Sequence, residues 1–91
     1  MNTIINKDKE KETNIIATDF ILTKYQEFEK GEIGRETFVK KINIENVKDY
    51  VRSERPHIEG QVGEKAFNYI INNAVAEYTL KSFNLESGKL L

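Results

Sequence analysis

The chain has 91 residues, and its 14 basic and 15 acidic side chains nearly cancel to a formal net charge of −1 at pH 7. This length supports one domain with a modest core, and the charge balance provides neither the positive field of a nucleic-acid-binding protein nor the negative field of a DNA mimic. Because there is no cysteine, a disulfide framework and a thiolate metal site are excluded.

The N-terminal stretch, residues 1–12, is predicted to be a disordered charged arm, because it has almost nothing apolar to bury after Ile5. Its apolar part is too short for a signal peptide, and no later stretch is long and apolar enough to cross a bilayer. We therefore expect a soluble, cytoplasmic protein with no membrane partner.

The first helix is predicted between residues 14 and 30, where apolar side chains recur at spacings of four, four and three. Gly31 stands where a left-handed C-terminal cap is expected. The apolar face of this helix consists of Ala17, Ile21, Tyr25 and Phe28.

A second, short helix is predicted after Gly34, and a third over residues 44–54. Asn43 is suited to cap the third helix, because its side-chain oxygen can accept a hydrogen bond from a free backbone N–H of the first turn. Pro56 ends this helix, since the residue before a proline is pushed out of helical geometry. Residues 57–62 are predicted to be a connector.

The last helix is predicted over residues 63–83, and residues 86–91 are predicted to be a flexible tail. Because no stretch alternates with the period of a strand, we predict an all-α fold, a compact bundle of about four helices over residues 13–85. The apolar side chains of the last helix form two clusters on opposite sides. One cluster holds Phe67, Ile70, Ile71, Ala74, Val75 and Tyr78, and the other holds Tyr69, Ala76, Leu80 and Phe83.

Two similar phrases, GEIGRETFVKKIN from Gly31 and GQVGEKAFNYIIN from Gly60, raise the question of a repeated ligand-binding loop. Neither phrase has the carboxylates of an EF-hand calcium loop, the basic setting of a Gly-x-x-Gly nucleic-acid clamp or the lysine of a P-loop. We interpret the phrases as two helix starts, in which Phe38 and Phe67 anchor the helix that follows.

The chain shows no motif for catalysis. His57 is the only histidine, and no HExxH, GxSxG or P-loop pattern occurs. We therefore predict no enzymatic activity, no catalytic residue, no cofactor and no metal site.

A DNA-binding regulator is the alternative function, because residues 35–55 resemble a helix-turn-helix in having a short helix, a tight break and a second helix. Glu45 and Asp49 lie on the same predicted helix and would repel a phosphate backbone. The residues that would contact DNA are Lys40, Lys41, Asn46, Lys48, Arg52 and Arg55.

The second apolar cluster of the last helix predicts a partner-binding surface. If the opposite face packs in the core, Tyr69, Leu80 and Phe83 remain for a protein target or for a second copy of the chain. The residue pattern alone slightly favours the other packing, in which the first helix on one side and the second and third on the other bury both faces and leave no patch. We expect a non-enzymatic protein-binding modulator, such as an accessory or inhibitor protein. Abundant isoleucine, asparagine and lysine indicate AT-rich codons and suggest a bacterial phage or other mobile element.

Overall fold

The computed structural model describes the backbone of residues 7–90 and the side chains of residues 7–84. Every regular element in this part of the chain is a helix, so the predicted all-α bundle is confirmed. The helices are α1 (Lys7–Glu29), α2 (Arg35–Lys41), α3 (Ile44–Glu54), α4 (Ile58–Val62) and α5 (Glu64–Leu90).

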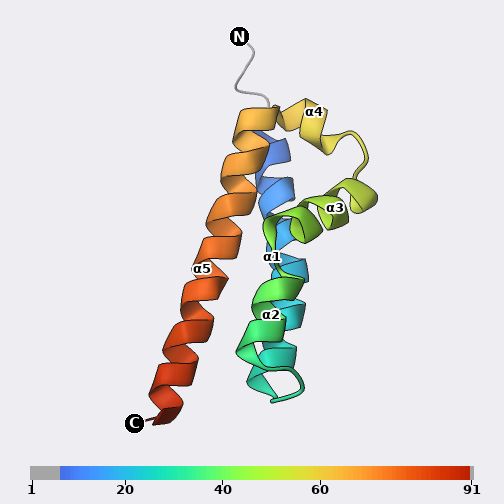
Figure 1. Cartoon of the computed structure of the whole chain (residues 1–91). Coiled ribbons are helices and arrows are strands. Elements are labelled where there is room, and N and C mark those ends of the chain that lie inside the picture. Colours follow the sequence, from blue (N-terminus) through green and yellow to red (C-terminus); the bar gives the residue numbers. More distant parts are fainter. Residues whose placement is uncertain (1–6, 91) are drawn as a thin grey trace.

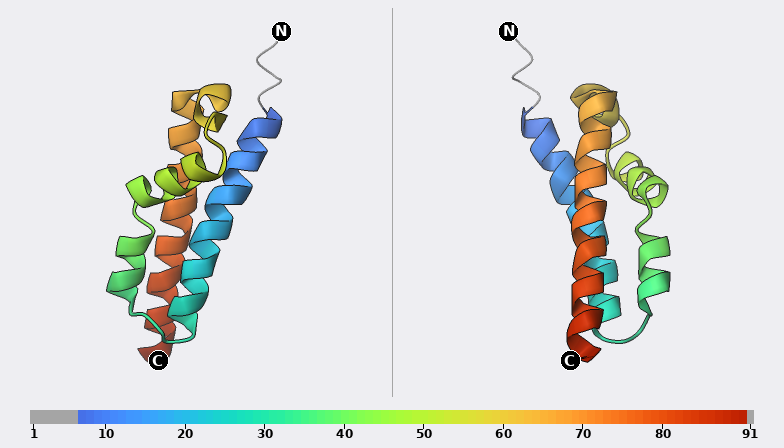
Figure 2. Two further views of the ribbon diagram at one scale, coloured as in Figure 1. Left: turned by 90° about the vertical axis from the view of Figure 1, so that its right-hand side faces the viewer. Right: turned by 60° about the vertical axis from the view of Figure 1, so that its left-hand side comes forward.

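The two long helices, α1 and α5, lie side by side and run in the same direction (Figure 1). Helix α2 returns antiparallel to α1 after a tight turn, and α3 crosses the bundle obliquely (Figure 2). Helix α4 lies at the end of the bundle where α5 begins. The other helices all lie to one side of α5, which leaves its opposite side open.

The core collects buried apolar side chains from all five helices. At its centre the rings of Phe28 and Phe38 stack with centroids 5.5 Å apart, and the ring of Tyr25 meets Phe38 edge-on at 5.6 Å and Tyr78 at 5.5 Å. Aromatic pairs of this kind add to the free energy gained from burying the rings. The buried apolar residues are Ala17, Ile21, Phe28, Phe38, Ile42, Val47, Val51, Ile58, Val62, Phe67, Ile71 and Ala74.

The helix ends follow the predicted chemistry at two positions. Gly31 has φ = 82°, the left-handed conformation in which a glycine ends α1 without a Cβ clash. The side chain of Asn43 accepts a hydrogen bond of 2.9 Å from the N–H of Asn46, so the predicted cap of α3 is confirmed.

The two glycine phrases differ in backbone geometry, although Phe38 and Phe67 both anchor the next helix with no exposed surface. Gly31 is left-handed, whereas its counterpart Gly60 lies inside α4. Conversely, Gly63 has φ = 99° and ends α4. The similarity therefore belongs to the helices that follow and not to a repeated loop.

The helices extend further than predicted at three places. Helix α1 begins at Lys7, so residues 7–12, expected in the arm, are helical; residues 1–6 of that arm lie outside the described residues. The connector over residues 57–62 is largely helical, because α4 buries Ile58 and Val62 against the core.

Helix α5 continues to Leu90 through most of the tail predicted for residues 86–91, and only residue 91 lies outside the described backbone. Within residues 7–90, no helix combines the length and the apolar character needed to cross a membrane.

Candidate protein-binding surface

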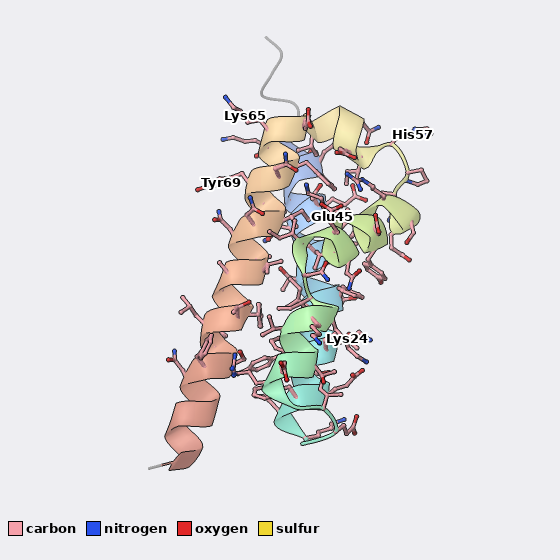
Figure 3. All side chains as sticks on the ribbon, in the orientation of Figure 1. Lys24, Glu45, His57, Lys65 and Tyr69 are labelled. Carbon is pink, nitrogen blue, oxygen red and sulfur yellow. The ribbon has the colours of Figure 1, made fainter. Side chains whose placement is uncertain are left out.

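The exposed side of α5 carries a row of apolar side chains, which we call the outer stripe and define as Tyr69, Ala76, Leu80 and Phe83. The exposed fractions are 67% for Tyr69, 62% for Leu80 and 46% for Phe83. These residues lie on the side of the helix opposite the buried Phe67, because about 100° separates successive residues of an α-helix. Figure 3 shows Tyr69 pointing away from the other helices.

This exposure decides between the two predicted packings of the last helix. The idea that neighbouring helices bury both of its faces is wrong for the described residues, since only the cluster around Phe67 enters the core. Within the described residues, the other four helices all lie on the inner side of α5, so none of them covers its outer side. The three residues predicted to bind a partner therefore all lie at the surface.

Phe83 is held in place from a second helix. The guanidinium of Arg35, the first residue of α2, lies 4.1 Å from the centre of the Phe83 ring. A cation over an aromatic face is attracted by the ring's electron density, so this contact connects the start of α2 to the outer stripe. Sequence reasoning missed Arg35, because 48 residues of chain separate it from Phe83 and no local pattern connects them.

An open groove of roughly 740 Å³ lies beside the N-terminal end of the outer stripe. A Cβ added to Gly63 would have no atom within 4 Å, so the glycine contributes open space to this groove. No local pattern in the sequence predicts the groove, which forms where α4 turns into α5. Its lining consists of Val62, Gly63, Glu64, Lys65, Ala66 and Tyr69.

The part of α5 between Ala66 and Ala76 carries no charged residue, although 32% of the whole chain is charged. Its exposed positions are filled by Tyr69, by Asn72 and Asn73 and by Ala76. Charged residues are depleted at the centres of protein interfaces, where aromatic residues are enriched. This segment is therefore free of charge and carries one exposed aromatic ring, Tyr69.

The arginines of the alternative DNA-binding surface are engaged within the protein. Arg52 forms a two-pronged ion pair with Glu59 of α4, with Nε–Oε1 at 2.8 Å and Nη2–Oε2 at 3.2 Å. It also lies over the ring of Phe67, 5.7 Å from its centre. Arg55 contacts Glu12 of α1 with Nε–Oε2 at 2.6 Å.

These ion pairs shift the pKa values of the groups involved. The hydrogen bond from Arg52 holds the pKa of Glu59 below its ordinary value of 4.5, and the same bond raises the pKa of Arg52. The hydrogen bond from Arg55 likewise lowers the pKa of Glu12. Because the carboxylates stay ionised, they offset the positive charge that a phosphate would need.

The remaining DNA-binding candidates are no better placed to read bases. The side-chain amide of Asn46 donates to the backbone oxygens of Lys40 and Lys41, each at 3.3 Å, and so helps to hold the turn between α2 and α3. Lys41 lies 3.9 Å from a carboxylate oxygen of Glu27. Lys48 is half-buried on α3, near enough to Glu59 to help lower the pKa of its carboxyl.

His57 lies exposed at the start of α4, beside a hollow of roughly 500 Å³ that Glu59 also lines. Glu59 uses both carboxylate oxygens to accept hydrogen bonds from Arg52. Among residues 7–84, no three histidine, cysteine or acidic side chains are grouped so that they could hold a metal ion.

No protein-family model, no curated protein and no solved structure matches this chain. Its function therefore has to be argued from its own residues.

Proposed function

We propose that this protein is a non-enzymatic protein-binding modulator that acts through the outer stripe of α5. The observation that supports this proposal most directly is the exposure of Tyr69, Leu80 and Phe83 in one row on one helix. Large apolar side chains that gather on one surface commonly mark an interaction site, and aromatic residues dominate the binding energy of such sites.

The other two candidate sites of the chain support the same proposal by contrast. The arginines of α3 are paired with carboxylates, and Glu59 beside the single histidine is held by Arg52. The stripe, by comparison, lies next to a charge-free segment and an apolar-lined groove. A surface of this kind gains free energy by covering apolar area and offers no group for bond-breaking chemistry.

The role in a cell that suits these properties is that of an accessory or inhibitor protein in the cytoplasm. A chain of this size can occupy part of a larger protein's surface and so block or redirect it. The abundance of isoleucine, asparagine and lysine supports an origin in a low-GC bacterium, its phages or other mobile elements, and the absence of cysteine fits a reducing compartment.

The proposal is tested by comparing capture by the wild-type protein with capture by the double variant Leu80→Asp/Phe83→Asp, in nuclease-treated lysate of a low-GC bacterium. Two buried carboxylates would leave unpaired charges in the interface, so we expect the double variant to retain at most a tenth of any specific protein band. The matched control is Ile15→Asp, which places the same charge at a 60% exposed apolar position on α1 and should leave capture unchanged.

Circular dichroism shows that each variant is folded before capture is measured. A band that both folded variants retain at the wild-type level would remove the outer stripe as the binding surface. A parallel capture from the same lysate without nuclease is the reference. A band that appears only in this untreated sample would favour nucleic acid as the ligand.

A further inference from the structure

We propose that the outer stripe of α5 binds a second copy of this chain, with the two α5 helices antiparallel. The inference rests on the proposed function, because it uses the same surface and names its partner. Three observations carry it: the spacing of the stripe, a projecting ring at one end with a groove at the other, and the charges beside them.

The spacing of the stripe is that of a helix–helix seam. The polar Asn73 lies between Tyr69 and Ala76, and together with it the residues of the outer stripe follow one another in steps of four, three, four and three residues. This alternation is the heptad pattern that keeps one line of side chains facing a neighbouring helix. The line faces away from the protein's own core, and within residues 7–90 no other helix lies along it.

The two ends of the stripe are complementary to each other. Phe83 projects at the C-terminal end, and the groove lined by Val62, Gly63 and Ala66 lies at the N-terminal end. In the proposed register, the two-fold axis between the two antiparallel α5 helices passes midway between Asn73 and Ala76. Phe83 of each copy then lies at the same height as Ala66 of the other.

The same register suits the other positions of the seam. Each Tyr69 comes opposite Leu80 of the second copy, and each Asn73 comes opposite Ala76. Each aromatic side chain of the stripe therefore lies opposite a smaller or an aliphatic one. Because of the two-fold axis, the same contact between Phe83 and the groove forms at both ends of the stripe. A parallel pair would instead place the two Phe83 rings against each other and leave both grooves empty.

The charges beside the stripe agree with the antiparallel register. Arg35, stacked on Phe83, would approach Glu64 at the rim of the second copy's groove, which brings opposite charges together. Lys65 comes level with the neutral Asn84, and Glu77 comes level with the neutral Asn72. The nearest like charges are the two Glu77 side chains, about 7.5 Å apart along the seam, and each Glu77 is paired with Lys81 of its own helix at 3.5 Å, which reduces their repulsion.

The size of the seam predicts a weak dimer. From Lys65 to Asn84 the helix is about 28 Å long, and at about 10 Å wide it covers roughly 300 Å² of each copy in projection. Stable interfaces bury about 800 Å² of accessible surface per partner, so a seam of this size belongs with weak, transient contacts, and we expect a dissociation constant on the order of 100 μM. At protein concentrations near this dissociation constant, a fraction of the molecules is monomeric and has an unoccupied outer stripe.

Sedimentation velocity of the whole chain at concentrations up to about 1 mM tests the dimer, since this limit lies above the expected dissociation constant. We expect a monomer–dimer equilibrium that Leu80→Asp weakens at least tenfold and that Phe83→Ala weakens as well. Ile15→Asp, with the same charge on the exposed side of α1, should change the dissociation constant less than twofold. A chain that stays monomeric up to this limit would overturn the inference.

Single cysteines test the orientation, because the natural chain has none. In the antiparallel register a mixture of Tyr69→Cys and Leu80→Cys proteins forms a mixed disulfide dimer, whereas Tyr69→Cys alone does not, since its two thiols lie about 16 Å apart along the seam. Efficient crosslinking of Tyr69→Cys with itself would show a parallel pair and contradict the proposed register.

The outcomes separate this inference from the proposed function. A monomeric wild type whose capture of another protein still depends on Leu80 and Phe83 would reject self-association and keep the protein-binding role. A wild type that neither self-associates nor captures a protein would reject both.

Discussion

Two surfaces of this small protein were predicted as sites from equally simple patterns, and the folded chain treats them in opposite ways. The basic residues of α3 find carboxylates: Arg52 pairs with Glu59 and Arg55 with Glu12. The apolar stripe of α5 finds no such cover, and Tyr69 and Leu80 stay more than 60% exposed. A long charged side chain can reach a partner on a neighbouring helix, whereas a row of apolar side chains needs a whole element to cover it.

The two surfaces also differ in how much their residues contribute to the stability of the fold. The arginine pairs tie α3 to α4 and to the first turns of α1, so they contribute to the fold. The stripe contributes little to the fold, because its side chains face away from the core. Substitutions at the two surfaces should therefore have different effects, and the following measurements test that difference.

The largest effect is expected where α5 faces inward. Phe67→Ala removes a fully buried ring and should lower the free energy of unfolding by about 3–5 kcal/mol, through lost burial and the cavity that remains. Leu80→Asp on the outer side of the same helix should change it by less than about 0.5 kcal/mol. Urea titration followed by circular dichroism measures both values. Equal losses would mean that the stripe is part of the core.

A smaller effect is expected at the arginine pair. Arg52→Ala removes the two-pronged contact with Glu59 and should lower the free energy of unfolding by about 0.5–1 kcal/mol, the range for partly exposed ion pairs of good geometry. The control Arg52→Lys keeps the charge but loses the planar fork, so part of the loss should remain. Self-association should be unaffected, and a dimer that weakens in Arg52→Ala would contradict the separation of the two surfaces.

The same pair predicts a dependence of stability on pH. Because the pKa of Glu59 is lower in the folded chain than its ordinary value of 4.5, the pair stabilises the protein above that value. This contribution is lost as the pH falls through the lower pKa of the folded state. Urea titrations from pH 7 to pH 3 should therefore show the wild type more stable than Glu59→Gln near neutrality, with the difference vanishing in acid.

Glu12 is expected to act in the same direction, since its pKa is lowered by Arg55. The control is Glu32→Gln, which removes one carboxylate and leaves both arginine pairs intact. A constant gap between wild type and Glu59→Gln down to pH 3 would show that the carboxylate is not paired in solution.

The smallest effect is expected in DNA binding. With their charges offset by Glu59 and Glu12, the arginines should support no salt-sensitive gel shift of duplex DNA near physiological ionic strength. Arg52→Ala/Arg55→Ala should then migrate like the wild type. A shift that the wild type gives, that salt abolishes and that this variant lacks would restore the helix-turn-helix function.

Local chemistry decided several features that the sequence alone predicts. Helix α3 occupies residues 44–54, as predicted, because Asn43 caps its start and Pro56 prevents its continuation. Gly31 ends α1 because a left-handed residue is needed there. The inward cluster of α5 follows from helical periodicity, which also predicted that Tyr69, Leu80 and Phe83 share the opposite side.

Only the tertiary structure decided what covers each face and which charges meet. The first turns of α1 are helical although they lack apolar residues, and Glu12 there meets an arginine 43 positions away in the chain. Residues 57–62 form α4 because Ile58 and Val62 can enter a core that other helices build. The sequence alone determined that α5 has two apolar sides. The number and placement of the other helices decided that one of these two sides stays exposed. Local spacing could not predict this, because contacts between distant residues depend on how the helices pack.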